Sequence, residues 1–248
     1  MRISPSIMCA DPLNVAEAVR SIERGAAESI HVDIMDGRFV PGFTFGADFV
    51  RRLVANTSLP LDVHLMSELP AAHVDQFLSL GVDSLSIHVE AQGDTAAILR
   101  HIRVKGCRCG VALSPETPID AVKGFLPQIH MVLMMTVAPG SVGHPQSDEC
   151  VEKAGALVRY LRGAGYSDIE VVADGGVKPD NIGRLVAGGI QRAVSGTGVF
   201  RPDMSPENAL KLFAQRIAEA SRHARADPGS TAARPPDAKL VQQSRGAP

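Results

Sequence analysis

Two segments of the chain share one alternating pattern: Ile30-His31-Val32-Asp33-Ile34-Met35 and Leu61-Asp62-Val63-His64-Leu65-Met66. Because successive side chains of a strand point to opposite faces, each segment predicts a strand with one wholly aliphatic face. The opposite face carries histidine, aspartate and methionine in both segments. An aliphatic face is expected to pack against helices, so the polar face is expected to point into the centre of the fold.

Strand-like segments of this kind alternate with amphipathic, helix-length segments along the chain. Strands are expected at 2–8, 29–35, 61–66, 84–90, 109–113, 130–137, 169–174 and 193–195, and helices at 13–24, 47–55, 71–80, 95–104, 150–162, 182–187 and 206–222. Eight such alternations without an Asn-Gly hairpin signal predict an α/β fold with a parallel sheet. They fit a (β/α)8 TIM barrel better than an open dinucleotide-binding sheet, because no Gly-x-Gly-x-x-Gly follows the first strand.

Composition narrows the class of protein further. The 248 residues carry a net charge of −2, no tryptophan and two tyrosines, which disfavours a nucleic-acid binder. No stretch suits a membrane span or a signal peptide, so we expect a cytoplasmic protein with reduced thiols. We expect one barrel domain over residues 1–221. Residues 222–248 contain four prolines and no aromatic residue, which predicts a disordered tail.

The inward faces of several strands bring ionisable side chains into one interior, where they are costly unless paired or bound to a metal. His31, Asp33, His64 and Asp174, the last at the end of a later strand, match the ligands of a divalent metal such as zinc. Other readings remain open. The methionines can be ordinary barrel filler, His88 can be structural, and Asp62 can orient a ligand histidine.

Glycine-bearing turns follow three consecutive late strands, at residues 138–143, 174–176 and 195–198. Glycine lets backbone N–H groups approach an anion, and barrels often hold a phosphate at their last loops. Together the three turns favour a phosphorylated substrate.

Four motifs resemble the ribulose-phosphate 3-epimerase family: I-S-P-S-I-M-C-A-D (residues 3–11), H-V-D-I-M-D-G-R-F-V-P (31–41), L-D-V-H-L-M (61–66) and A-D-G-G-V (173–177). The resemblance extends over about residues 3–201. It implies a (β/α)8 barrel that inverts C3 of a ketose phosphate with a divalent metal, of which zinc is expected first and iron, manganese or cobalt are alternatives. Ribulose 5-phosphate is the first substrate to consider. The resemblance also suggests a homo-oligomer.

The resemblance assigns roles to individual residues. His31, Asp33, His64 and Asp174 match the metal ligands, and Asp33 and Asp174 also match two catalytic acid/base carboxylates. The positions matched to substrate binding are Ser6, Met35, His64, Met66, His88, Met135, Gly140, Gly143, Gly175, Gly176, Gly196 and Thr197.

The chain also departs from the family pattern. Residues 138–144 read A-P-G-S-V-G-H instead of N-P-G-F-x-G-Q, which leaves the identity of the ketose phosphate open. The opening M-C-A-D also resembles an allulose-6-phosphate epimerase branch. A barrel that binds a sugar phosphate without turnover is an alternative of another class. A lyase or decarboxylase is disfavoured because no lysine lies in an expected strand.

Overall fold

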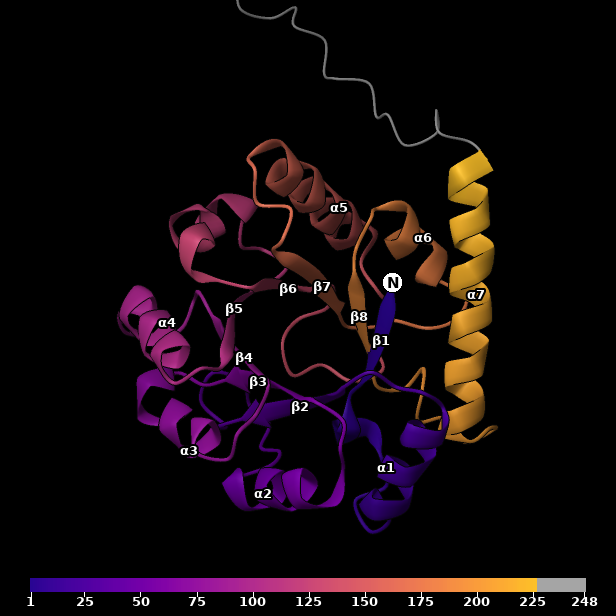
Figure 1. Cartoon of the computed structure of the whole chain (residues 1–248), viewed down its shortest axis with the longest axis horizontal. Coiled ribbons are helices and arrows are strands. Elements are labelled where there is room, and N and C mark those ends of the chain that lie inside the picture. Colours follow the sequence, from indigo (N-terminus) through magenta and orange to yellow (C-terminus); the bar gives the residue numbers. More distant parts are fainter. Residues whose placement is uncertain (227–248) are drawn as a thin grey trace, which may run out of the picture.

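The structure is a computed structural model and describes residues 1–226. In this range eight strands form one parallel sheet with the order β1-β8-β7-β6-β5-β4-β3-β2. A backbone bridge between Ser6 and His31 brings the two ends of this order together, so the sheet nearly closes into a barrel (Figure 1). The strands are β1 (Arg2–Pro5), β2 (Ile30–Met35), β3 (Leu61–Met66), β4 (Ser84–His88), β5 (Arg108–Leu113), β6 (Met131–Met135), β7 (Glu170–Asp174) and β8 (Arg192–Ser195). The predicted α/β TIM barrel is therefore confirmed.

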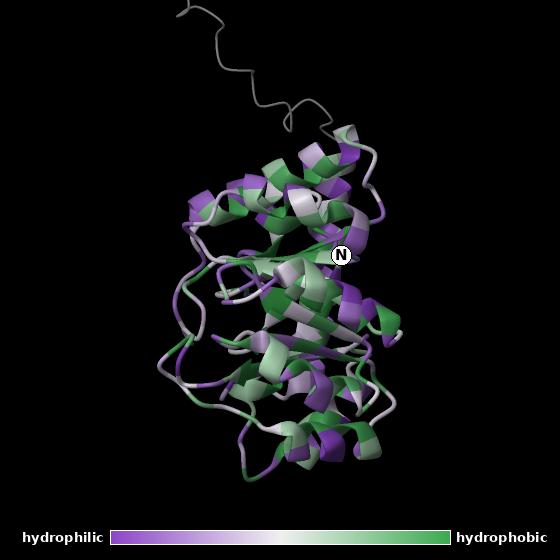
Figure 2. Cartoon of the chain, turned by 90° about the vertical axis from the view of Figure 1, so that its left-hand side faces the viewer, coloured by the Kyte–Doolittle hydropathy of each residue, from purple (hydrophilic) through white to green (hydrophobic). Residues whose placement is uncertain are grey.

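Helices surround this barrel on its outer side (Figure 1). They are α1 (Val15–Arg24), α2 (Ala47–Asn56), α3 (Val74–Leu78), α4 (Thr95–Val104), α5 (Asp148–Gly163), α6 (Ile182–Ala187) and α7 (Pro206–Ala226). On β2 the aliphatic side chains of Ile30, Val32 and Ile34 are buried in the main hydrophobic core. Figure 2 shows the hydrophobic colour along the strands in the middle and a mixture of both colours on the outer helices.

The interior of the barrel contains both ionisable and apolar side chains. Side chains of β5 to β8 contribute a separate hydrophobic cluster, which consists of Ala112, Met131, Leu133, Met135, Val172 and Val194. On β2 and β3 the register instead pairs His31 with Asp62, Asp33 with His64 and Met35 with Met66. The ionisable side chains of β2 and β3 therefore share the interior with this apolar cluster.

Several element boundaries differ from the sequence prediction. β1 ends at Pro5 rather than at residue 8, and Met8 lies in a short 3-10 helix, η1 (Ile7–Cys9). β4 ends at His88, because the chain turns there and the amide of Ala91 donates to the carbonyl of His88. β6 ends at Met135 rather than at residue 137. The sequence analysis predicted no helix between β5 and β6, where the 3-10 helix η3 (Ile119–Gln128) lies. Another 3-10 helix, η2 (Pro70–Ala72), precedes α3.

The last described helix, α7, packs against α1 and α6 and closes the outer layer. It continues to Ala226, so residues 222–226 are helical where the sequence predicted the start of a tail. The rest of the predicted tail, residues 227–248, lies outside the described residues. Among the described helices, none combines the length and the hydrophobicity that crossing a membrane requires.

Candidate active site

Four buried side chains meet near the carboxyl ends of β2, β3 and β7. They are His31, Asp33, His64 and Asp174, and one nitrogen or oxygen atom of each lies within 4.8 Å of the others. Asp33 Oδ1 lies 3.4 Å from His31 Nε2 and 3.1 Å from His64 Nδ1. Asp174 Oδ2 lies 3.6 Å from each of the same two nitrogens. The barrel thus gathers the four residues that the sequence indicates as metal ligands.

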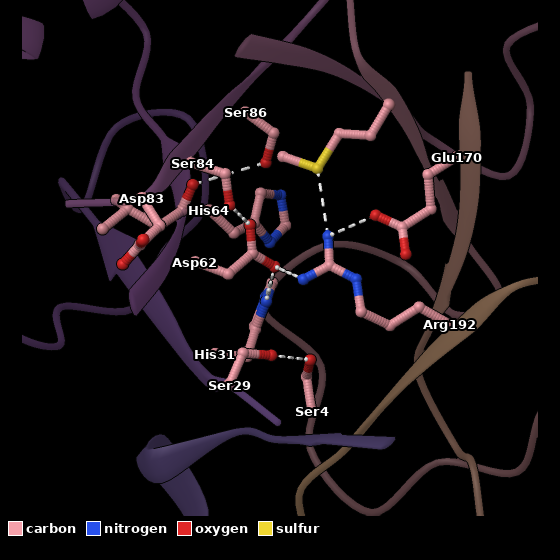
Figure 3. A network of polar contacts seen from close by, with 12 residues as sticks. Ser4, Ser29, His31, Asp62, His64, Asp83, Ser84, Ser86, Glu170 and Arg192 are labelled. Carbon is pink, nitrogen blue, oxygen red and sulfur yellow. Dashed lines mark hydrogen bonds and ion pairs between the residues drawn. The ribbon is translucent and has the colours of Figure 1, made fainter. Parts of the chain in front are cut away.

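Hydrogen bonds behind the two imidazoles determine which nitrogen faces this cluster. His31 Nδ1 lies 2.9 Å from Asp62 Oδ2, and an ionised carboxylate only accepts, so Nδ1 donates and Nε2 faces the cluster (Figure 3). His88 Nδ1 donates to Glu90 Oε2 at 2.9 Å. The Nε2 atom of a neutral His88 then accepts from His64 Nε2, which lies 2.9 Å away. His64 consequently turns its Nδ1 toward the two aspartates.

The cluster has the chemistry of a divalent-cation site. His31 Nε2 is buried and has no hydrogen-bond partner among the described residues. Burial alone would lower the pKa of His31, but Asp33 and Asp62 raise this pKa well above its ordinary value. Burial alone would raise the pKa of Asp33, whereas the imidazoles of His31 and His64 lower it. The arrangement therefore needs positive charge between the imidazoles and the carboxylates, and two histidines with two carboxylates form a donor set that suits a divalent metal.

The hydrogen bonds behind His64 end at Glu90, and their effect on the pKa of Glu90 can be tested. Burial would raise the pKa of Glu90, but hydrogen bonds from His88, Thr117 and the Ser114 amide outweigh it and lower the pKa from 4.5 to about 2. A lowered folded-state pKa stabilises the protein above pH 4.5, and this stabilisation is lost as the pH falls toward 2. We therefore expect Glu90→Gln to lower the free energy of unfolding at pH 7, but by only about 1 kcal/mol, because solvent screens the charge of this partly exposed side chain.

Chemical denaturation of the wild type and of Glu90→Gln at several pH values tests this expectation. The difference between the two proteins should narrow as the pH falls below 4.5. Glu116 is an exposed carboxylate of the following loop, so Glu116→Gln is the matched control and should leave the stability unchanged. A constant difference between Glu90→Gln and the wild type from pH 7 to pH 3 would contradict the interpretation.

A cavity opens beside Asp33 and Asp174, and both carboxylates form part of its wall. The thioethers of Met35, Met66 and Met135 form part of its wall. All three glycine-bearing turns also border it, at Gly140 and Gly143, at Gly175 and Gly176, and at Gly196 and Thr197. One cavity therefore joins two carboxylates, an apolar wall and backbone suited to an anion.

Comparison with known proteins decides the family. The model of the "Ribulose-phosphate 3 epimerase family" matches residues 2–200. The chain is 37% identical over 198 residues to ribulose-phosphate 3-epimerase of Treponema pallidum, which covers 80% of this chain and 90% of that protein. It is 34% identical over 200 residues to the Bacillus subtilis protein of the same name, covering 81% of this chain and 92% of that protein. The chain belongs to the ribulose-phosphate 3-epimerase family.

This epimerase-family chain is accordingly an isomerase of the class that acts on carbohydrates. A more distant similarity supports the fold alone. The crystal structure of phosphoribosyl anthranilate isomerase from Thermus thermophilus superimposes with a TM-score of 0.62 at 15% identity, covering 88% of this chain and 99% of that one.

Most of the residues that the sequence assigns to substrate binding border the cavity of this epimerase-family barrel. They are Ser6, Met35, Met66, Met135, Gly140, Gly143, Gly175, Gly176, Gly196 and Thr197. Ser6 also donates a hydrogen bond from Oγ to Asp33 Oδ2 at 2.5 Å. His64 and His88 are fully buried and do not border the cavity. His88 lies behind His64, so the structure places it among the supports of the cluster rather than on the wall of the cavity.

Several residues around the site were not among the site residues predicted from the sequence. Met8 and Cys9 border the cavity because the chain turns into η1 after Ser6. The ring of Phe39 covers that of His88, with 4.6 Å between the ring centroids. Glu90 follows His88 by two residues, and this spacing was the one available signal for its role. Phe39 lies in a loop, where no periodicity indicates a contact.

The turn after β7 gives a second prediction. A side chain at Gly176, whose φ is +63°, would place its Cβ 2.4 Å from the amide nitrogen of Gln146 and 2.7 Å from the carbonyl of His144. Both atoms belong to the neighbouring loop, so Gly176→Ala would displace the backbone beside the anion-binding turns. We expect kcat/KM for the sugar phosphate to fall by about 10²-fold.

Steady-state kinetics test this prediction by comparing kcat/KM of Gly176→Ala with that of Gly81→Ala. Gly81 has a φ of +76° but open space around its Cβ, so Gly81→Ala carries the backbone strain without the clash. Gly81→Ala should lose stability and keep its kcat/KM. Equal kcat/KM for the two variants would show that the close approach at Gly176 does not matter.

Proposed function

We propose that this protein is a metal-dependent epimerase that inverts C3 of a ketose phosphate, with D-ribulose 5-phosphate to D-xylulose 5-phosphate as the first choice. The observation that carries the proposal is the position of Asp33 and Asp174, which border the same cavity and contact the same two imidazoles. The curated relatives named ribulose-phosphate 3-epimerase support the choice of substrate.

Inversion at C3 needs proton transfer on both faces of the carbon. A single base tends to return the proton to the face from which it came. Asp33 lies within β2, and Asp174 is the last residue of β7, so the two carboxylates approach the cavity from separate strands. One aspartate removes the C3 proton, and the other delivers a proton to the opposite face.

His31, Asp33, His64 and Asp174 would hold a divalent metal, with zinc expected first and iron, manganese or cobalt as alternatives. When bound, the metal would supply Lewis-acid stabilisation of the negative charge that develops as the proton α to the carbonyl leaves. Ser6 holds Asp33 in place through its hydroxyl. Met35, Met66 and Met135 keep water from the reacting carbon, because thioethers offer no strong donor.

The phosphate of the substrate is expected at the glycine-bearing turns, close to Gly176, Gly196 and Thr197. Ser141 and Val142 also border the cavity, in the loop that departs from the family pattern. Allulose 6-phosphate or another ketose phosphate is therefore the second candidate. A cytoplasmic location and a homo-oligomer remain predictions.

Incubation of the zinc-loaded protein with ribulose 5-phosphate in deuterated water tests the proposal. We expect xylulose 5-phosphate with deuterium at C3 as the product, and NMR detects it. Faster turnover of allulose 6-phosphate than of ribulose 5-phosphate would favour the six-carbon substrate. Bound metal and bound sugar phosphate without exchange at C3 would contradict the enzyme and favour a binding protein.

A further inference from the structure

Arg192 on β8 extends across the interior of the barrel and contacts Asp62, which in turn contacts His31 (Figure 3). It is 5% exposed. Its Nη1 donates to Asp62 Oδ2 on β3 at 3.0 Å. Its Nη2 lies 3.2 Å from Glu170 Oε2 on β7 and donates to the sulfur of Met131 at 3.1 Å. A single guanidinium therefore joins opposite sides of the barrel.

The carboxylate of Asp62 is fixed on both of its oxygens. Oδ2 accepts from Arg192 and also from His31 Nδ1, while Oδ1 accepts from the Ser84 hydroxyl at 2.5 Å. Asp62 therefore cannot turn without breaking at least one of these bonds. His31 in turn is held with Nε2 toward Asp33 and Asp174, because its Nδ1–H is committed to Asp62.

Arg192 is itself anchored from below. Glu170 is buried and contacts Arg2 of β1 and, at 3.7 Å, Arg108 of β5, both at the amino-terminal end of the barrel. The planar fork of Arg192 donates a hydrogen bond to Asp62 and forms an ion pair with Glu170 through its two terminal nitrogens, whereas an ammonium group has only one nitrogen to share between them. Removal of the guanidinium would leave Asp62 as a buried anion without its partner across the barrel. His31 would then lose the fixed acceptor that orients it.

We propose that Arg192 is a positioning residue that acts through Asp62 to hold His31 Nε2 toward the bound metal. This inference rests on the proposed metal role of the cluster. It assigns to Arg192 a function in metal affinity, beyond the packing of the barrel interior. Groups behind metal-binding histidines commonly affect metal affinity by about 10- to 100-fold.

Zinc titration of the full chain by calorimetry tests the inference. We expect Arg192→Met to weaken zinc binding by about 10- to 100-fold and Arg192→Lys to recover part of the loss. The melting temperature of each variant is also measured. A purely structural role of Arg192 would lower the melting temperature and leave the zinc affinity unchanged. Arg108→Met is the matched control, since Arg108 contacts Glu170 but not Asp62, and it should bind zinc as the wild type does.

A double substitution tests whether Arg192 affects zinc affinity through Asp62. If Arg192 acts through Asp62, then Arg192→Met should cause no further loss of zinc affinity in an Asp62→Asn background. This comparison also serves if Arg192→Met alone does not fold, because the double variant removes both buried charges. Wild-type zinc affinity in Arg192→Met, or a further loss in the Asp62→Asn background, would overturn the inference. Absence of zinc binding by the wild type would instead contradict the proposed metal site.

Discussion

Replacing Asp174 by asparagine is expected to lower kcat for C3 epimerisation by about 10²- to 10⁴-fold while the barrel stays folded. Asp174 is the last residue of β7 and borders the cavity together with Asp33. An amide neither takes up nor returns a proton, so one face of the substrate loses its acid/base group. The kcat with ribulose 5-phosphate, circular dichroism and the bound metal content are measured together. Asp120→Asn changes an exposed aspartate of η3 and should leave all three unchanged.

Exchange of the C3 proton with solvent distinguishes the roles of Asp33 and Asp174 more clearly than the turnover rate does. In deuterated water, Asp174→Asn should still exchange the C3 proton of one epimer through Asp33. Asp33→Asn should exchange only the other epimer, through Asp174. Neither variant should convert one epimer into the other at an appreciable rate. Exchange of both epimers by either variant, at full metal content, would contradict the assignment of one aspartate to each face.

Alternation along the strands was sufficient to predict most of the barrel. On β2 and β3 the aliphatic positions are buried against helices, and the polar positions meet inside, as the period of two requires. The four-residue cluster follows from this pattern, because strands that share an interior bring their inward side chains together. Asp174 was predicted from its place at the end of a strand, where barrel chemistry occurs.

The parts that could not be predicted depend on contacts across the barrel. Arg192 and Glu170 face inward on β8 and β7, but nothing local to either strand indicates that Arg192 reaches Asp62, 130 residues away in sequence. The position of Met8 depends on the turn after Ser6, which the continuous apolar pattern conceals. The 3-10 helix η3 contains Pro127, which cannot donate a helical hydrogen bond, and it packs against α4 and β5.

Removal of the metal is expected to abolish epimerisation almost completely. Lewis-acid stabilisation of the charge that develops beside the carbonyl is worth several kcal/mol, which corresponds to a loss of about 10³-fold or more in kcat. Without a cation, the buried carboxylates of Asp33 and Asp174 retain only protons on His31 and His64 as counter-charge. We therefore also expect the stripped protein to melt at a lower temperature, because metal that binds only the folded state stabilises it.

Dialysis against a chelator, metal analysis and re-addition of zinc, manganese or cobalt test this prediction. Activity should return with one metal ion per chain. His64→Gln should bind metal weakly and remain inactive after re-addition, since it removes an imidazole whose Nδ1 faces both aspartates. His101→Gln is the matched control, because His101 lies on α4 and pairs with the exposed Asp75, away from the cluster. Undiminished turnover with less than about one tenth of a metal ion per chain would contradict the prediction. It would mean that the protonated histidines alone balance the charge of Asp33 and Asp174 during the reaction.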